Sequence, residues 1–181
     1  MGRRTTGQAT SMRRAPTPLG ALARGLAAGV VGTVAMTGWQ ELASRLRSSN
    51  GSSSESSAPQ SEREAWEQAP APAQVGKRIV EGVFGASVSA ERIGLLTTVM
   101  HWGYGAGWGG VYGLVQSTRG RRRLRDGLVF GTTVWAMSYA ELVPMGIYDP
   151  PWTYPPQELA LDLSYHLAYG AGLASAYRVL A

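Results

Sequence analysis

Cysteine is absent from the 181-residue chain, and only 16% of its residues are charged. The lack of cysteine excludes a disulfide-stapled fold and a thiolate metal centre. The chain also lacks the Gly-x-Ser-x-Gly and His-Glu-x-x-His motifs of hydrolases, and its glycine runs do not form a phosphate-binding loop. These absences favour a protein without enzymatic activity, and no cofactor is expected.

The mean hydropathy of −0.10 is that of a soluble protein, but the polar residues are concentrated in segments 1–18 and 46–92. The four apolar windows outside them each exceed the ~20 residues that a helix needs to cross the hydrocarbon core. Small residues are frequent in every window, which allows helix backbones to approach closely. The sequence therefore predicts an all-α integral membrane protein with four transmembrane helices, at 19–43, 93–115, 126–148 and 159–180.

Two other interpretations of these windows remain open. In a soluble helical bundle the same windows would be buried core helices. The first window could instead be a cleaved signal, because Arg13 and Arg14 precede it. The length of the windows favours membrane spans over core helices, and the stretch 15–18 lacks the large apolar residue expected after a twin-arginine pair.

Arginine is distributed unequally between the two sides of such a bundle. The basic tail 1–18 and the loop 119–125 fall on one side, whereas the long loop 46–92 on the other side carries most of the acidic residues. The positive-inside rule then places both termini in the cytoplasm and the protein in the plasma (inner) membrane. The bilayer and its anionic headgroups suffice as partners for the basic loop, which lacks the interleaved aromatic residues of a nucleic-acid site. A membrane-protein partner or a second copy of the chain is also compatible with the sequence.

The outer loop 46–92 has two parts of different character. Segment 48–73 is rich in serine, glutamate and proline, which predicts a flexible tether. Segment 75–90 has apolar residues at helical spacing, which predicts an amphipathic surface helix. This helix either lies in the membrane interface or caps the mouth of the bundle, and Lys77 and Arg78 beside its apolar stripe favour the interface.

The second and fourth windows share a motif, His-x-x-Tyr-Gly-Ala-Gly-x4-Tyr, which begins at His101 and at His166, the only histidines of the chain. A weaker, gapped similarity relates the first window to the third. We interpret these two sequence similarities as evidence for two copies of a helical hairpin. The Gly-x3-Gly spacings within the windows are expected to serve packing inside the chain rather than dimerisation. The repeat predicts a face of paired aromatic residues formed by Tyr104, Tyr112, Tyr169 and Tyr177.

Ionisable residues of all four windows fall at a similar depth near the outer side. Two carboxylates come late in the outward-running helices and the two histidines come early in the inward-running ones. Because an ionisable group inside a membrane is costly unless it is paired or hydrated, these residues form the candidate site. It comprises Glu41, His101, Glu141, Asp162 and His166.

The cluster permits three classes of function. The first is a structural or accessory membrane bundle, in which the carboxylates snorkel to the interface and the histidines hydrogen-bond across helices. The second is a proton or ion pathway, because carboxylates beside imidazoles can exchange protons near neutral pH. The third is a metal site for Zn, Mn or Fe, although only the Asp162-x3-His166 pair has ligand spacing on one helix face.

The segment Gly25–Val31, with Trp39 and Glu41 in the first window and His166-Leu167 in the last, resembles the YagU-like family of small bacterial inner-membrane proteins. The resemblance implies a multi-span helical inner-membrane protein. It implies no particular chemistry.

Overall fold

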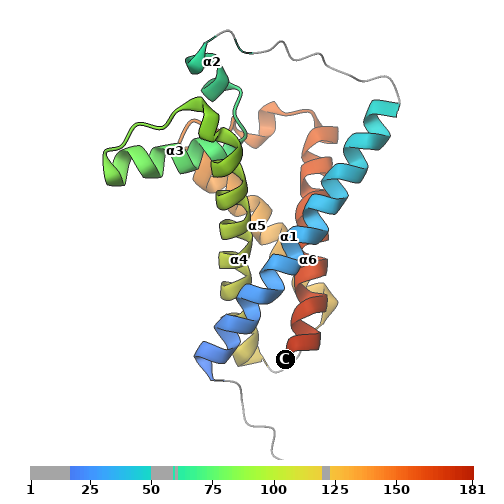
Figure 1. Ribbon diagram of the computed structural model, residues 1–181. Coiled ribbons are helices and arrows are strands. Elements are labelled where there is room, and N and C mark those ends of the chain that lie inside the picture. The colour runs from blue at the N-terminus through green and yellow to red at the C-terminus, as the bar shows by residue number, and fades with distance from the viewer. Residues whose placement is uncertain (1–16, 50–58, 60, 120–122) are drawn as a thin grey trace, which may run out of the picture.

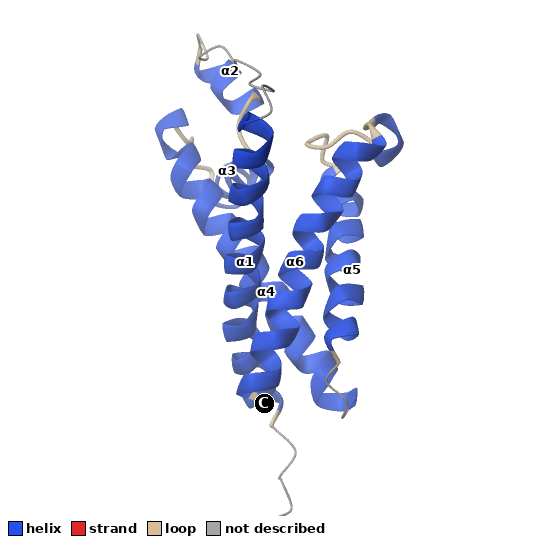
Figure 2. Cartoon of the chain, turned by 90° about the vertical axis from the view of Figure 1, so that its right-hand side faces the viewer, coloured by secondary structure: helices blue, strands red, loops and turns tan. Residues whose placement is uncertain are grey.

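The computed structural model describes residues 17–49, 59, 61–119 and 123–181, and all regular secondary structure in these residues is helical. Four long helices are joined by short helical turns and by a two-helix segment in the longest connection (Figures 1 and 2). The elements are α1 (Pro18–Ser49), α2 (Glu62–Glu67), α3 (Ala71–Phe84), η1 (Ala90–Arg92), α4 (Ile93–Arg119), α5 (Leu124–Leu142), η2 (Pro151–Thr153) and α6 (Pro156–Leu180).

The long helices α1, α4, α5 and α6 form one elongated bundle (Figure 1). The start of α1, the end of α4, the start of α5 and the C-terminus lie at one end, which we call the inner end (Figure 1). Helices α2, α3 and η2 lie at the other, the outer end. Helix α1 packs on α4 and α6, and α6 packs on α5. Helices α4 and α5 are further apart and meet through large side chains, because Phe130 of α5 stacks edge-on against Trp108 and Tyr112 of α4. Among the helices of the described residues, only α1 is both long enough and, with a mean hydropathy of 1.6, apolar enough to be a candidate membrane span by composition alone.

Three of the four predicted windows extend further as helices, and the third is shorter. Helix α5 ends at Leu142 rather than at 148. Pro144 follows, and Gly146 adopts the left-handed conformation with φ of 63°, which an L side chain rarely adopts. The apolar composition of 143–148 therefore concealed a turn. At its other end α5 is capped by Asp126, whose Oδ2 accepts a hydrogen bond of 3.1 Å from the Arg123 N–H.

Glycines bring the helices of each hairpin into backbone contact. A Cβ atom added to Gly29 would lie 2.9 Å from the Gly109 Cα of α4, and one added to Gly25 would lie 2.9 Å from the Gly113 Cα. In the second hairpin, Gly127 of α5 faces Gly170 of α6 in the same way. These glycines therefore serve helix packing within the chain, as the sequence predicts.

The glycine contacts show which residues of the two hairpins occupy equivalent positions. This alignment differs from the one that the gapped sequence similarity gives. Gly29 meets the motif glycine of α4, Gly105, as Gly127 meets Gly170 of α6. In this register Glu141 corresponds to position 43 and not to Glu41. A difference of two residues rotates a side chain by about 200° around a helix, so the two carboxylates point in different directions.

The outer loop is more ordered than its composition indicates. The expected flexible tether 48–73 includes the last two residues of α1, all of α2 and the start of α3; residues 50–58 and 60 lie outside the described residues. Trp66 is only 7% exposed and packs with Ala69, Ala73 and Val88 in a small apolar cluster. The flexible-tether prediction is therefore wrong for 61–73, because one tryptophan and a few alanines suffice to fix the segment.

The amphipathic helix α3 lies across the outer end of the bundle (Figures 1 and 2). It ends at Phe84 rather than at residue 90, because Gly85 takes the left-handed conformation that commonly terminates helices. Gly76 packs against Leu96 and Met100 of α4, and the Arg78 guanidinium donates a hydrogen bond to the Met145 carbonyl beyond α5. The first part of α3 therefore covers the mouth of the bundle, whereas its C-terminal part projects beyond the bundle with Val83 and Phe84 exposed (Figure 1).

Candidate functional site

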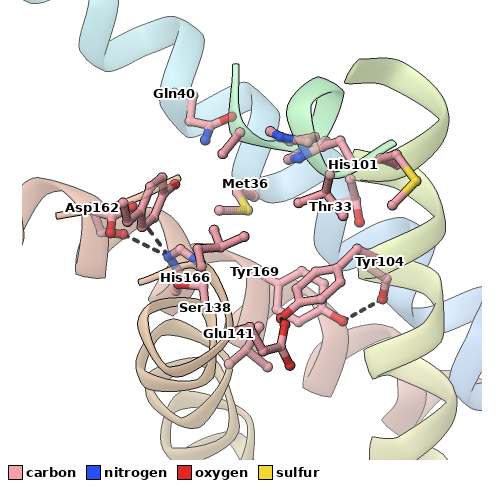
Figure 3. Close-up of a pocket in the computed structure, with 18 of the residues that line it drawn as sticks. Thr33, Met36, Gln40, His101, Tyr104, Ser138, Glu141, Asp162, His166 and Tyr169 are labelled. Carbon is pink, nitrogen blue, oxygen red and sulfur yellow. Dashed lines mark hydrogen bonds and ion pairs between the residues drawn. The ribbon is translucent and has the colours of Figure 1, made fainter. Parts of the chain in front are cut away.

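A cavity of about 260 Å³ lies in the outer half of the bundle, beneath α3 and between the four long helices (Figure 3). Four of the five predicted site residues line it, and Glu41 does not. The lining is otherwise dominated by methionine, tyrosine and aliphatic side chains. No lysine or arginine is among the described residues that line it. The four that do are His101, Glu141, Asp162 and His166.

Glu41 is instead a surface residue. Its side chain is 60% exposed and forms an ion pair of 2.8 Å with Arg45 one turn further along α1. The prediction that Glu41 joins the cluster is wrong, because the register between the hairpins turns it away from the position that Glu141 occupies in α5. On the neighbouring turn of α1, the Trp39 indole Nε1 donates a hydrogen bond of 2.9 Å to Ser164 Oγ of α6.

Glu141 accepts one hydrogen bond, of 3.0 Å, from the Tyr104 hydroxyl of α4 (Figure 3). None of the ion pairs among the described residues includes Glu141. A carboxylate offers about four acceptor positions, so most of its hydrogen-bonding capacity is not used by this contact. Tyr104 and Glu141 link α4 to α5, and both side chains are exposed, Tyr104 to 38%.

Asp162, in contrast, is well supplied with donors. Its Oδ2 accepts hydrogen bonds of 2.9 Å from the Trp135 indole and 3.2 Å from the Tyr139 hydroxyl, both of α5. His166 Nδ1 lies 2.9 Å from the Asp162 carbonyl and 3.7 Å from its Oδ1. Because a carbonyl oxygen only accepts, Nδ1 is the donor in this hydrogen bond.

His101 contacts α1 rather than a carboxylate. Its Nε2 lies 3.4 Å from the Thr37 hydroxyl. The two histidines thus line one cavity, while no hydrogen bond or ion pair between described residues joins either histidine to Glu141. The predicted cluster therefore consists of separate polar pairs at one cavity: Tyr104–Glu141, Asp162–His166 and Thr37–His101.

The four repeat tyrosines form the floor of the cavity and the packed core below it, and they do not play equivalent roles. Tyr169 and Tyr177 are 2% and 1% exposed, and their hydroxyls donate to the Gly105 and Gly113 carbonyls of α4 at 2.6 and 3.1 Å. Tyr112 stacks edge-on against Tyr177 at 5.5 Å between ring centroids. Only Tyr104 directs its hydroxyl to a site carboxylate.

Sequence reasoning missed the donors that hold Asp162. Trp135 and Tyr139 are four residues apart and therefore share one face of α5, and they present an indole N–H and a hydroxyl in an apolar helix. That spacing was a usable signal. Tyr148 beyond α5 was also overlooked: it lines both this cavity and a second one of about 390 Å³ at the outer surface, and burial, with Asp162 and Tyr154 nearby, raises its pKa to about 12.

The site does not have the geometry of a metal centre. In the described part of the chain, no three histidine, aspartate or glutamate residues are placed so that they could hold an ion. The alternative of a Zn, Mn or Fe site at this cluster is therefore wrong for these residues, since such metals take three or more protein ligands.

Comparisons with known proteins found no relative from which a function could be inferred. The chain matches no protein-family model, no curated protein and no solved structure.

Proposed function

We propose that the chain is a multi-pass plasma-membrane protein in which α1, α4, α5 and α6 all cross the bilayer. The shortest of them, α5, has 19 residues and spans about 28 Å, close to the thickness of the hydrocarbon core. Large apolar side chains along α1, α4 and α5 are exposed, where lipid would cover them. They include Val30, Val31 and Val34 of α1, Leu95, Val99 and Val111 of α4, and Leu128, Val129 and Met137 of α5.

The orientation follows from the ends of the bundle. The inner end carries the basic residues Arg119, Arg123 and Arg125 of the α4–α5 connection, which the positive-inside rule assigns to the cytoplasm. Both termini then lie in the cytoplasm, and α2 and α3 lie outside. The basic tail 1–16 and Arg121–Arg122 support the same orientation by sequence but lie outside the described residues.

Within this membrane bundle, we infer that the outer cavity is a binding site for a small molecule and that the protein acts as an accessory membrane component. The observation that carries this inference is the position of the cavity above a closed core. Below it, Leu173, Tyr169 and Tyr177 are at most 2% exposed, and glycine contacts bring the helices of each hairpin together. A cavity that ends on a packed core is suited to binding.

The same packing disfavours the alternative of a proton or ion pathway. A pathway would need polar groups or water from the cluster to the inner end. The tyrosine hydroxyls in that region are already used in hydrogen bonds to the α4 carbonyls of Gly105 and Gly113. Liposomes that contain the protein should therefore show no more proton flux under a pH gradient than empty liposomes.

Chemical access to the cavity tests the binding-site proposal. The natural chain has no cysteine, so Ser138→Cys places a single thiol in the cavity wall. Trimethylammonioethyl methanethiosulfonate, whose permanent charge keeps it from crossing the membrane, should modify it when added to intact cells. The matched control Ser175→Cys, on the exposed inner part of α6, should react only in opened membranes. An unreactive Ser138→Cys in a folded protein would contradict the proposal.

A further inference from the structure

The outer cavity contains acidic groups that the protein does not neutralise. Glu141 has a single hydrogen bond, from Tyr104, and no ion-pair partner among the described residues. Asp162 lies on the opposite side of the same cavity, next to His166. No described lysine or arginine lines the cavity, so a positive charge that enters it meets the carboxylate of Glu141 without an ion-pair partner to displace.

Aromatic and sulfur-containing side chains make up much of the remaining wall. The rings of Tyr104, Tyr148 and Tyr169 line the cavity, together with Met36 and Met100. Tyrosine faces attract cations through their quadrupoles, and this attraction is stronger for groups shielded from water. Methionine supplies a polarisable apolar surface that adapts to the shape of a bound group. This wall suits a cation that carries apolar groups.

The same lining is unsuited to a metal cation or an anion. Hard cations such as Mg²⁺ and Ca²⁺ require about six oxygen ligands, and no suitable group of three acidic or histidine residues exists in the described part. An anion would be repelled by Glu141 and Asp162. The volume of about 260 Å³ is just below the ~300–1,000 Å³ of typical small-molecule sites, which restricts the ligand to a compact molecule.

We propose that the outer cavity binds a small organic ammonium ion, with Glu141 as its counter-ion and the tyrosine rings around its alkyl groups. This inference rests on the proposed binding site and names its ligand class. Tyr104 of α4 and Glu141 of α5 both line the cavity, and both side chains are exposed. The ammonium group displaces no salt bridge of the protein, because Glu141 is not engaged in one.

The ligand class is tested by asking whether a bound ammonium ion protects a thiol in the cavity from chemical modification. A cation is compared with a neutral molecule of the same shape. The purified full chain carrying Ser138→Cys is held in lipid nanodiscs and modified with methyl methanethiosulfonate. Choline should slow the reaction about tenfold when present at about ten times its Kd. Its neutral carbon isostere, 3,3-dimethylbutan-1-ol, should give little protection at the same concentration. Equal protection by the isostere, or none by choline, would overturn the proposal.

Separate substitutions of Glu141 and Glu41 test which glutamate is the counter-ion of the bound ammonium group. Glu141→Gln should abolish protection by choline, whereas Glu41→Gln, at the exposed carboxylate paired with Arg45, should leave it intact. Protection retained in the Glu141→Gln protein would overturn the assignment of Glu141. The reaction of Ser138→Cys without choline separates the two proposals: no reaction refutes the binding site, and reaction without ammonium protection refutes only the ligand class.

A second measurement needs no change at Glu141 and so does not depend on the folding of that variant. The rates at which cationic trimethylammonioethyl and anionic sulfonatoethyl methanethiosulfonates modify Ser138→Cys are compared, each divided by its rate at Ser87→Cys in the exposed outer loop. The cationic reagent should be favoured at Ser138→Cys by about tenfold, which corresponds to about 1.4 kcal/mol. A ratio near one would contradict an acidic, cation-selective cavity.

Discussion

Two glycines of α4 that look alike in the sequence should respond in opposite ways to the same substitution. A Cβ atom at Gly109 would lie within contact of the Gly25 and Gly29 backbones of α1, whereas one at Gly107 would meet no atom within 4 Å. Both substitutions to alanine gain about the same helix propensity, up to ~1 kcal/mol. At Gly109, overpacking against backbone that cannot move aside costs typically about 1–3 kcal/mol.

Because the propensity gain is common to both variants, their difference isolates the packing cost. Gly107→Ala should be neutral or slightly stabilising, and Gly109→Ala should be less stable than it by about 1–3 kcal/mol. For a chain of this size each kcal/mol moves the midpoint by about 2–4 °C, so thermal unfolding in one detergent resolves the two. Equal stability of the two variants would refute the close packing of α1 on α4.

Three further predictions concern the hydroxyl groups. Tyr177→Phe should lower the free energy of unfolding by about 0.5–1.5 kcal/mol, because it removes the hydrogen bond to the Gly113 carbonyl; an unchanged stability would contradict that bond. A double-mutant cycle of Tyr104→Phe with Glu141→Gln should give a coupling of about 0.6–2 kcal/mol, and additivity would show that the pair does not interact. Tyr148 has a pKa raised to about 12, so its phenol stays protonated in the folded protein above pH 10, where the unfolded chain ionises; stability should therefore fall as the pH rises from 10 to 12, and less so in Tyr148→Phe.

The helices of the bundle were predictable because each is long, rich in small residues and bounded by polar or proline-rich segments. Their positions agree with the windows read from the sequence, apart from the end of α5. Composition alone did not reveal that end, since the turn after Leu142 depends on Pro144 and on the positive φ of Gly146. The folded part of the outer loop was missed for a similar reason: its stability depends on where Trp66 is buried, which a polar average does not report.

The sequence predicted how far along the bundle the site residues lie, but not which side of its helix each residue faces. Alternating helix directions correctly brought His101, Glu141, Asp162 and His166 to one cavity. Which side of a helix a residue faces depends on the register of packing, and the gapped repeat misassigned that register in α1 by two residues. Glu41 was therefore included wrongly. The indole and hydroxyl donors of α5 that hold Asp162 were also not predicted.

The topology of the bundle is the central claim, and thiol labelling in intact cells tests it most directly. Single cysteines are placed at Ser87 in the outer loop and at Ser117 near the inner end of α4, in a chain that otherwise has none. Four membrane spans with both termini in the cytoplasm predict that a membrane-impermeant maleimide labels Ser87→Cys in intact cells and Ser117→Cys only after permeabilisation. Labelling of Ser117→Cys alone in intact cells would reverse the orientation. Labelling of both in intact cells would contradict a membrane-spanning bundle.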